Sequence, residues 1–539
     1  MYFALYDVTG IQKYIFQSSK LKENMGASTI VANITKQYLY ETIEEKCQHY
    51  HIDWEKDTNF KMLSNPTLEA EVIYSGGGKA VVAYQQIEVA KKVNQALSEK
   101  ILLKTGVNLL ICVIEKVEGI DFQKDLDQLY AKIHKKKNEY PPAKPMLGLS
   151  ITELCTRSQR PVSNIDTTES IKKYVPFELY SKQKAAYEFQ KEAKNNCLYF
   201  DCSKYEMPLD LDDLGRRDGE SHIAIIHIDG NSLGKTLQKY LEQYKDYQEA
   251  VAFIRTFSAF IAETYREVFK KMTRKLIHAI ENQSLERLKL KQKSEKIMLP
   301  LRDIVLNGDD VTFVCDARIA LSLTKKFLEE IQKYSIPNSD EKLSACAGIA
   351  IVKPHFPFQQ AYEIAEHCCS YAKAKAKAIH SDTPKSWLDF HIVQGGISEE
   401  LHQIRQKYYT YPEHKLDKGY HTYHLLWRPW IVGEDDSETE LYNIKKFHQI
   451  YTEFIKKWPR HRLKQFRNAL IQGENETALF LKEAKSRKLG LPKCFDATTL
   501  TGDLEVYTSE YITPFFDVLE MLDLYIPVGE EEPVKCSLK

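Results

Sequence analysis

The chain has 539 residues, which is too long for one hydrophobic core and predicts about three or four domains. Basic and acidic residues balance at 75 each, so the net charge provides no global attraction to nucleic acid or to an anionic membrane. No apolar run approaches the roughly 18 residues of a membrane-spanning helix, and the N-terminal sequence lacks a secretory signal pattern. The 11 cysteines form no CxxC pair, which favours reduced thiols in a cytoplasmic protein over disulfides or structural zinc.

Residues 1–125 show the alternation of apolar strands and amphipathic helices that is typical of an α+β layer. The predicted strands lie at 3–6, 70–74, 80–84 and 107–114, and the predicted helices lie at 11–16 and 86–103. A glycine-rich turn at 75–78 separates the two middle strands. We therefore expect a first domain at 1–125.

Two other segments carry weaker patterns. Residues 126–215 are rich in charge and have a helical pattern near 168–194, so we predict a helical connector domain. Their lysine run at 135–137 is more typical of a solvated helix face than of a nucleic-acid patch. Residues 390–539 have a mostly helical pattern without a catalytic motif, and we predict a helical C-terminal domain.

Residues 216–389 repeat the order of the first domain. The predicted strands lie at 222–228, 303–306, 311–315 and 343–352, and the predicted helices lie at 250–297, 317–334 and 358–378. In both regions an aspartate, Asp7 or Asp229, follows the first strand. A hairpin with a glycine-containing tip comes at a similar distance later, at Gly77 and at Gly308. This order predicts a duplicated module, with chance similarity of two α+β layers as the alternative.

The most informative segment is the hairpin at 304–314. Its Asn307 and Gly308 lie between two apolar strands, and both residue types tolerate the positive φ angles of a tight turn. A hairpin does not need the adjacent acids Asp309 and Asp310, whose carboxylates repel each other and lose hydration at a sheet edge. A divalent cation supplies the missing positive charge, and Mg²⁺ or Mn²⁺ prefers such oxygen ligands.

A third carboxylate, Asp229, ends the predicted buried strand at 222–228. In a palm-type layer this strand neighbours the hairpin, so we expect Asp229, Asp309 and Asp310 to converge as catalytic metal ligands. The backbone carbonyl of Gly230 is expected to add a ligand. Two ions held in this way suit nucleotidyl transfer, because one activates a ribose hydroxyl and the other stabilises the departing pyrophosphate.

Two further features concern phosphate. Lys373 flanks the apolar stripe of the predicted helix 358–378 and would neutralise phosphate charge, with a solvated helix end as the alternative. The segment 229–236 follows a strand and opens a helix, which imitates a phosphate-binding P-loop. Only three residues separate its glycines where that loop needs four, so a P-loop enzyme is the weaker hypothesis. Lys235 remains a candidate phosphate contact in the palm interpretation.

Together these motifs resemble the large polymerase-like subunit of type III CRISPR effector complexes and, more distantly, the GGDEF diguanylate cyclases. The similar segments lie in the same order at 7–12, 75–79, 229–234, 307–310 and 365–373. The resemblance implies an α+β fold in which two ferredoxin-like palm (nucleotidyl-cyclase) domains face each other, with helical domains between and after them. It also implies that ATP is converted into cyclic oligoadenylates, with metal at the second palm and nucleotide at both palms.

The resemblance also implies which residues bind nucleotide. Those of the first palm are Ser75, Gly76, Gly77, Gly78 and Lys79, and those of the second are Gly230, Asn231, Ser232, Leu233, Gly234, Lys235, Asn307, Gly308 and Lys373. The first tip has no acids to hold metal, but its backbone amides can approach phosphates closely. The first palm would therefore present the acceptor nucleotide to the second. Asp7 is expected to be structural rather than catalytic.

The chain departs from the family pattern in three ways. Asn307 stands where the hairpin motif usually has glycine, and the connector lacks the paired CxxC motifs of many members. The first palm begins at residue 1, without a His-Asp nuclease domain, so we expect no DNA cleavage. These departures indicate a divergent or stand-alone member.

The leading hypothesis is a cytoplasmic nucleotidyltransferase with two Mg²⁺ or Mn²⁺ ions. It would use ATP to make a cyclic oligoadenylate or cyclic dinucleotide messenger in antiviral defence. The expected partners are nucleoside triphosphates and a downstream receptor of the messenger, without a membrane; RNA and other effector-complex subunits stay open. The alternative is a catalytically silent RNA-binding scaffold of an effector ribonucleoprotein. The intact acid pair argues against it, because an inactive palm does not need uncompensated carboxylates.

Overall fold

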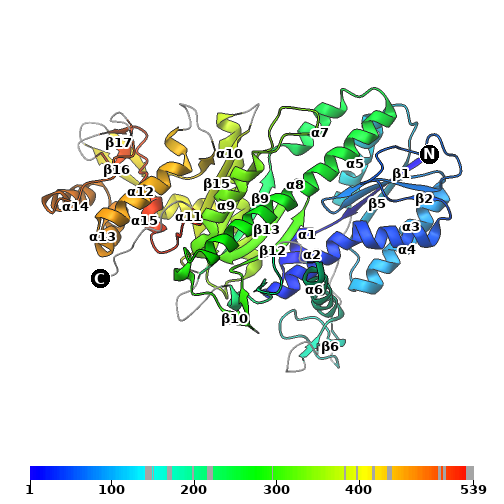
Figure 1. The fold of residues 1–539 in the computed structure, drawn as a ribbon, viewed down its shortest axis with the longest axis horizontal. Coiled ribbons are helices and arrows are strands. Elements are labelled where there is room, and N and C mark those ends of the chain that lie inside the picture. Colours follow the sequence, from blue (N-terminus) through cyan, green and yellow to red (C-terminus); the bar gives the residue numbers. More distant parts are fainter. Residues whose placement is uncertain are drawn as a thin grey trace.

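The computed structural model describes residues 1–139, 148–149, 151–166, 173–196, 200–214, 222–293, 295–380, 384–395, 399–415, 419–433, 440–495, 499–501 and 505–529. Figure 1 shows an elongated α+β molecule with the N-terminal sheet at one end, a second sheet in the middle and the C-terminal helices at the other end. The α+β fold class is as the sequence predicted. Within these ranges, no helix is both long and apolar enough to cross a bilayer.

The first sheet surrounds the N-terminal strand. In spatial order its strands are β2 (Tyr50–His51), β3 (Ala70–Gly76), β4 (Lys79–Tyr84), β1 (Tyr2–Val8) and β5 (Leu110–Lys116). The helices of this part are α1 (Ile11–Phe16), α2 (Leu21–Asn33), the π-helix η1 (Ile34–Tyr38), α3 (Leu39–Lys46), α4 (Ile87–Thr105) and α5 (Phe122–Glu139). Strand β1 is apolar along most of its length because both of its faces are buried.

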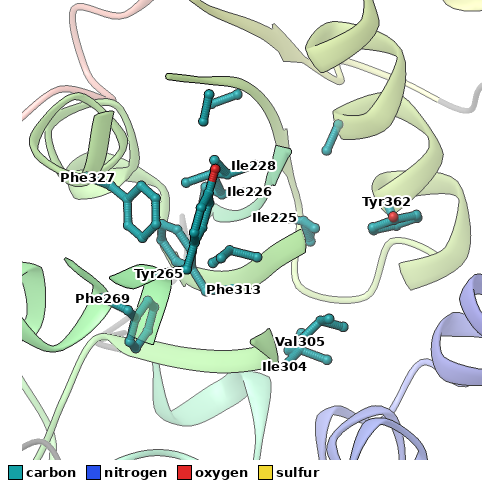
Figure 2. Packing of buried hydrophobic residues seen from close by; sticks show 14 of the residues in the cluster. Ile225, Ile226, Ile228, Tyr265, Phe269, Ile304, Val305, Phe313, Phe327 and Tyr362 are labelled. Atoms are coloured by element: carbon teal, nitrogen blue, oxygen red, sulfur yellow. The ribbon is translucent and has the colours of Figure 1, made fainter. Parts of the chain in front are cut away.

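The second sheet contains the predicted acidic hairpin. In spatial order its strands are β12 (Leu301–Asn307), β13 (Asp310–Asp316), β9 (Ile223–Gly230), β14 (Ala345–Val352), β15 (Ser386–Ile392) and β18 (Trp430–Val432). The helices around it are α7 (Leu233–Leu241), α8 (Tyr247–Glu281), α9 (Ala317–Ile331) and α10 (Phe358–Ile379). Figure 2 shows Tyr265, Phe269 and Phe327 packed on one face of this sheet, with Tyr362 of α10 on the other.

The sheets share one topology. The order β3-β4-β1-β5 matches β12-β13-β9-β14, and every neighbouring pair in both sets is antiparallel. Each hairpin also has a register shift at the same distance from its tip, between Val72 and Tyr74 in β3 and between Asp303 and Val305 in β12. A bulge is a specific feature of a strand pair, so its recurrence supports duplication over chance similarity.

The predicted long helix at 250–297 was wrong at its C-terminal end. Helix α8 ends at Glu281, and Gln283 has a positive φ of 58°, which interrupts helical geometry. Two short strands follow, β10 (Gln292–Lys293) and β11 (Lys296–Met298); β10 pairs with β11, and β11 pairs with β8 (Tyr205–Glu206). The charged composition of this segment suits a helix, but pairing with a distant strand determines its structure.

Elements cross two of the positions at which we expected domain boundaries. Helix α5 runs through residue 125 and packs its apolar face on the first sheet, and β15 runs through residue 389 into the second sheet. The connector contains β6 (Asn164–Asp166), β7 (Lys173–Val175) and α6 (Phe177–Asn196). Its helical pattern was expected from 168, but 168–172 lie outside the described residues.

The C-terminal part is less helical than predicted. Its helices are α11 (Leu401–Tyr408), α12 (Ile444–Lys457), α13 (Arg460–Gln472), α14 (Glu474–Ser486) and α15 (Phe516–Glu520), and its strands are β16 (Thr410–Lys415), β17 (Gly419–His424), β18, β19 (Leu500–Thr501) and β20 (Tyr507–Thr508). Stacked tyrosines hold the β16–β17 hairpin, with the rings of Tyr411 and Tyr423 5.0 Å apart. Aromatic residues on strands therefore account for the segments that the helical pattern missed.

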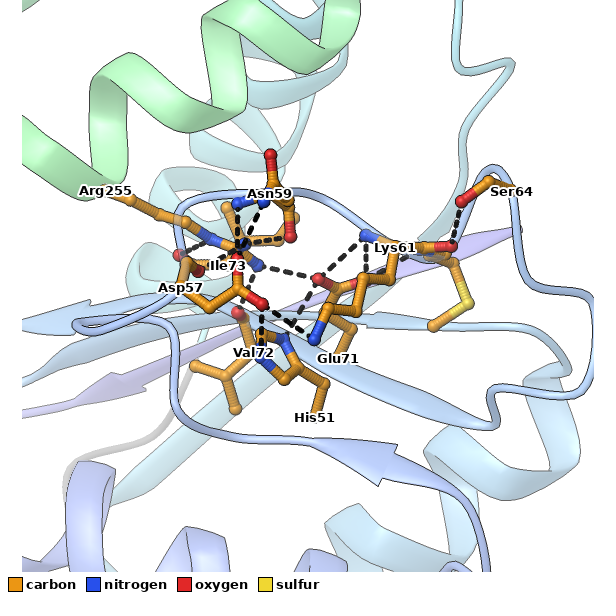
Figure 3. A network of polar contacts seen from close by, with 10 residues as sticks. His51, Asp57, Asn59, Lys61, Ser64, Glu71, Val72, Ile73 and Arg255 are labelled. Atoms are coloured by element: carbon orange, nitrogen blue, oxygen red, sulfur yellow. Dashed lines mark hydrogen bonds and ion pairs between the residues drawn. The ribbon is translucent and has the colours of Figure 1, made fainter.

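Helix α8 joins the two sheets through Arg255. Its guanidinium is fully buried and donates to the carboxylate of Glu71 at 3.0 Å and to the carbonyls of Val72 and Ile73 at 2.8 and 3.1 Å (Figure 3). It also donates to carbonyls of the loop before β3, at Asp57 and Asn59. A helix of the second module thus satisfies buried polar groups of the first.

A second contact joins α1 to α10. The ring of Phe16 stacks on that of Tyr362 at 4.0 Å, and the side chain of Gln12 donates to the hydroxyl of Tyr362 at 3.0 Å and to Glu366 at 3.1 Å. Both modules therefore meet beside the hairpin that carries Asp309 and Asp310.

Candidate functional site

The tips of the two hairpins touch each other. In the first module Gly77 and Gly78 form the two-residue turn with φ of 59° and 76°, angles that favour glycine. The backbone N–H of Gly77 donates to Oδ1 of Asn307 at 3.3 Å. Asn307, which replaces the usual glycine of the motif, thus links the two modules.

The turn of the second hairpin is one residue later than predicted. Asn307 pairs with Asp310 as the last residue of β12, so Gly308 and Asp309 are the turn residues, and Gly308 has φ of 67°. The Asn-Gly pair suggested a turn at Asn307, but Asn307 pairs with Asp310 and its side chain accepts a hydrogen bond from the first module. This register places Asp309 at the tip and Asp310 at the start of β13.

Asp229 and Asp309 lie close together at this end of the sheet. Burial raises the pKa of Asp309 from 3.8 to about 6, and the negative charge of Asp229 contributes to the rise. A methyl group on Gly230 would lie 3.0 Å from Cβ of Asp309 and 2.9 Å from the hydroxyl of Tyr265, so this position requires glycine. The buried Tyr265 hydroxyl has no hydrogen-bond partner among the described residues.

Lys373 is the positive charge at this site. Its Nζ forms an ion pair with Asp229 and donates to the carbonyl of Gly230 at 3.1 Å. Burial lowers the pKa of Lys373, but Asp229 raises it more, so the net shift is upward. Helix α10 can bring Lys373 this close because it packs on Gly348 of β14, where a Cβ would lie 1.9 Å from the carbonyl oxygen of Ala365.

Asp310 has different neighbours. Its Oδ1 lies 3.5 Å from Nδ1 of the buried His227, in the strand that leads to Asp229. Burial lowers the pKa of His227, but Asp310 raises it more, so the net shift is upward. Sequence analysis missed His227, although it lies two residues before Asp229 and therefore on the same face of β9.

The three predicted carboxylates lie close enough for Asp229 and Asp310 both to raise the pKa of Asp309, but they are not arranged as a ready metal cluster. In the described part of the chain, no group of three or more His, Cys, Asp or Glu side chains has the spacing of a metal site. Asp310 faces His227, and Lys373 is bound to Asp229. The donors that remain together are Asp229, Asp309 and the Gly230 carbonyl. They fit a hard divalent cation, because they are all oxygens and the raised pKa of Asp309 reflects its burial and the negative charge of Asp229 beside it.

The other predicted nucleotide-binding residues fall into two groups. Ser75 and Asn231 are buried and have structural partners: Ser75 Oγ donates to the carbonyl of Thr35 at 2.8 Å, and the Asn231 amide donates to Ser344 and to the Lys385 carbonyl. Leu233 packs against the core. The second group is exposed or half-buried and borders the tips or a cavity of about 280 Å³ beside Lys373; its members are Gly76, Gly77, Lys79, Ser232, Gly234 and Lys235.

Asp7 is buried, and its Oδ2 lies 2.7 Å from Nζ of Lys137 in α5. Lys136 of the same helix donates to the carbonyl of Cys112. The lysine run at 135–137 thus has contacts within the protein, and Asp7 has a partner that the sequence pattern did not indicate.

Asp309→Asn is expected to stabilise the protein at pH 8 in EDTA, by on the order of 1–2 kcal/mol. The raised pKa means that the native state binds this proton more tightly than the unfolded chain does, so the stabilising effect of protonation is lost as pH rises through about 6. The advantage of the variant should therefore shrink between pH 8 and pH 4. Thermal denaturation at both pH values measures the difference in stability between the variant and the wild type. An equal difference at pH 8 and at pH 4 would contradict the expected charge repulsion.

Part of the chain matches a known protein family. Residues 222–380 match the model of the Cas10/Cmr2 second palm domain. This match includes 229–236 and therefore favours the palm interpretation over a P-loop. A comparison with curated proteins finds no significant match.

Solved structures extend the likeness to nearly the whole chain. A Csm1–Csm4 cassette in complex with one ATP matches with a TM-score of 0.52 and 12% identity, covering 97% of this chain and 69% of that one. The cassette in complex with cA4 matches with a TM-score of 0.51 and 13% identity over 97% and 70%. At this identity the likeness concerns the fold. Residues 222–380 are therefore similar to the second palm domain of Cas10/Cmr2, and the chain as a whole has a fold similar to that of the Csm1–Csm4 cassette.

Proposed function

We propose that the chain is a metal-dependent nucleotidyltransferase that makes a cyclic oligoadenylate or cyclic dinucleotide from ATP in CRISPR-related defence. The observation that carries this proposal is the Asp229–Asp309 carboxylate pair, next to Lys373 and the tip of the first hairpin. A structural sheet edge has no need for a buried carboxylate whose pKa is raised by burial and by a neighbouring carboxylate.

Asp229, Asp309 and the Gly230 carbonyl would bind the metal directly, and Asp310 would lie next to these ligands. When bound, divalent ions supply charge that activates the attacking hydroxyl and stabilises the leaving group. Lys373, now bound to Asp229 and Gly230, would then be free to contact phosphate. Lys235, Ser232 and Gly234 border the same small cavity and would contact the remaining phosphate oxygens.

The first palm would hold the acceptor nucleotide. The tip residues Gly76, Gly77 and Gly78 lie next to Asn307. A Cβ atom at Gly76 or Gly77 would meet no other atom within 4 Å, so the backbone there is open to a ligand. A ribose hydroxyl presented there would attack the α-phosphorus of the donor, forming the new P–O bond while the bond to the β-phosphate breaks. Pyrophosphate leaves, and the hydroxyl proton passes to solvent.

The solved relatives support the substrate class. Csm1–Csm4 structures contain ATP, cA4 or cA3. By analogy we propose ATP as substrate, a cytoplasmic location, and association with other effector subunits or RNA. A receptor for the cyclic product would act downstream.

Incubation with radiolabelled ATP and Mn²⁺ tests this function. The wild-type chain is expected to release pyrophosphate and a phosphatase-resistant oligonucleotide, whereas the Asp309→Ala/Asp310→Ala variant is expected to form neither. Circular dichroism should show that the variant is folded. Absence of product from both chains, together with tight RNA binding, would support the scaffold alternative.

A further inference from the structure

A basic groove continues from the small cavity beside Lys373. The groove has a volume of about 1210 Å³ and shares Asn231, Ser232 and Lys235 with the small cavity. It extends along α7, past the loops that precede β14 and β15, to Gly433 after β18 and Lys445 in α12. This volume exceeds the usual range for one small ligand, about 300–1,000 Å³, so the groove provides space beyond the phosphates of one bound nucleotide.

The charge of the groove is positive although the chain as a whole is neutral. Lys235, Lys342, Lys377 and Lys445 line it without an ion pair to any described residue. Its acids are largely balanced: Glu329 lies 3.8 Å from Lys325, and Glu341 lies 3.5 Å from Lys239. Asp340 is the remaining acid. Four uncompensated lysines around one acid favour a small ligand of high negative charge.

The lining has few apolar or aromatic surfaces for a nucleobase. Ile336 and Leu343 are buried, and Leu233 and Pro384 are the other apolar side chains among the described lining residues. Single-stranded nucleic acid is usually held by aromatic rings that stack on its bases, and the described residues that line this groove include no aromatic side chain. The chemistry therefore suits phosphate groups rather than bases.

The strand register places the groove on one side of Asp229 and the hairpin tips on the other. At this end of the sheet, Val311 of β13 pairs with Ile228, next to Asp229, and Gly230 pairs with Ala345 at the start of β14. The groove residues Ser344, Lys385 and Gly433 adjoin the ends of β14, β15 and β18, the next strands in order. Asp229 thus separates the first-palm tip from the groove.

We propose that this groove binds inorganic pyrophosphate as it leaves the active site. This inference rests on the proposed function. In an in-line displacement the leaving group departs opposite the attacking hydroxyl. A hydroxyl presented from the first-palm tip therefore directs pyrophosphate past Lys373 toward the unpaired lysines. The 5′-triphosphate of a growing product has the same chemistry, and the experiment separates the two sources.

Calorimetric titration of pyrophosphate into the full chain, without ATP, tests the site. Lys342→Ala/Lys445→Ala is expected to weaken binding by about tenfold or more, because two charge-assisted contacts are lost. Both residues lie away from Asp229 and Lys373. The matched control is Lys91→Ala/Lys92→Ala, which removes the same charge from exposed positions on α4 and should leave pyrophosphate affinity unchanged.

Equal pyrophosphate affinity in the wild type and the groove variant would overturn the proposal. So would a groove variant that loses affinity only for a 5′-triphosphorylated diadenylate and not for pyrophosphate. In the ATP assay the groove variant should keep its initial rate within about twofold and be less inhibited by added pyrophosphate. If pyrophosphate binding depends on the lysines but the wild type forms no product from ATP, the polyphosphate site stands and the proposed transferase activity fails.

Discussion

Asp309→Asn is expected to reduce product formation from ATP by on the order of 10³-fold, whereas Asp310→Asn should stay within about tenfold of the wild type. Asp309 lies at the turn beside Asp229 and Gly230, where its carboxylate would hold metal. Asp310 lies beside His227 and would act mainly by orienting its neighbours. The two adjacent acids are thus expected to differ in importance, which the motif alone does not indicate.

Initial rates at saturating ATP and Mn²⁺ measure this difference. Mn²⁺ binding followed by electron paramagnetic resonance provides a second readout, in which Asp309→Asn should weaken metal binding far more than Asp310→Asn. The variants Asp309→Asn and Asp310→Asn are controls for each other, because each removes one negative charge from adjacent positions. Equal losses of rate and metal affinity would show that both carboxylates bind the metal directly, as a three-carboxylate site requires.

Arg255→Met is expected to destabilise the protein by about 3–5 kcal/mol, because it leaves the buried carboxylate of Glu71 without its ion-pair partner. Both side chains are fully buried, and the guanidinium also satisfies carbonyls of Val72 and Ile73. Glu71 keeps hydrogen bonds from the backbone of Lys61 and Met62 and a contact with Nδ1 of His51 at 3.2 Å, which do not replace the guanidinium. Since Arg255 comes from α8, the change should also loosen the junction between the palms.

Denaturant unfolding followed by tryptophan fluorescence measures this loss. Arg255→Met/Glu71→Leu should recover part of it, because an apolar pair replaces a buried ion pair without leaving a lone charge. Lys271→Met on the same helix is the matched control: its ion pair with Glu330 is 42% exposed at the lysine, and its loss should change stability by less than about 1 kcal/mol. A similar small effect for Arg255→Met would refute a structural role for the buried pair.

Local patterns predicted much of both palms. The strands and helices near 3–6, 11–16, 70–84, 311–315 and 358–378 are where periodicity and glycine turns indicated them. These predictions succeed because each element has one dominant local signal, an apolar run or a 3.6-residue stripe. The errors lie where distant partners decide the structure. Strands β10 and β11 form because β8 is available as a partner for β11, and β18 joins the second sheet by pairing with β15.

The sequence by itself determined the duplicated module, the two glycine tips and the presence of acids and a lysine near one strand end, because these depend on residue type and spacing within short segments. Only the tertiary structure decided which acid faces which neighbour. Because the turn lies one residue later than predicted, Asp309 lies close to Asp229 and Asp310 lies close to His227. Contacts between modules, from Asn307 to Gly77 and from Arg255 to Glu71, join the hairpin tip and the long helix to the first sheet. Such contacts join residues far apart in the chain, so no local pattern encodes them.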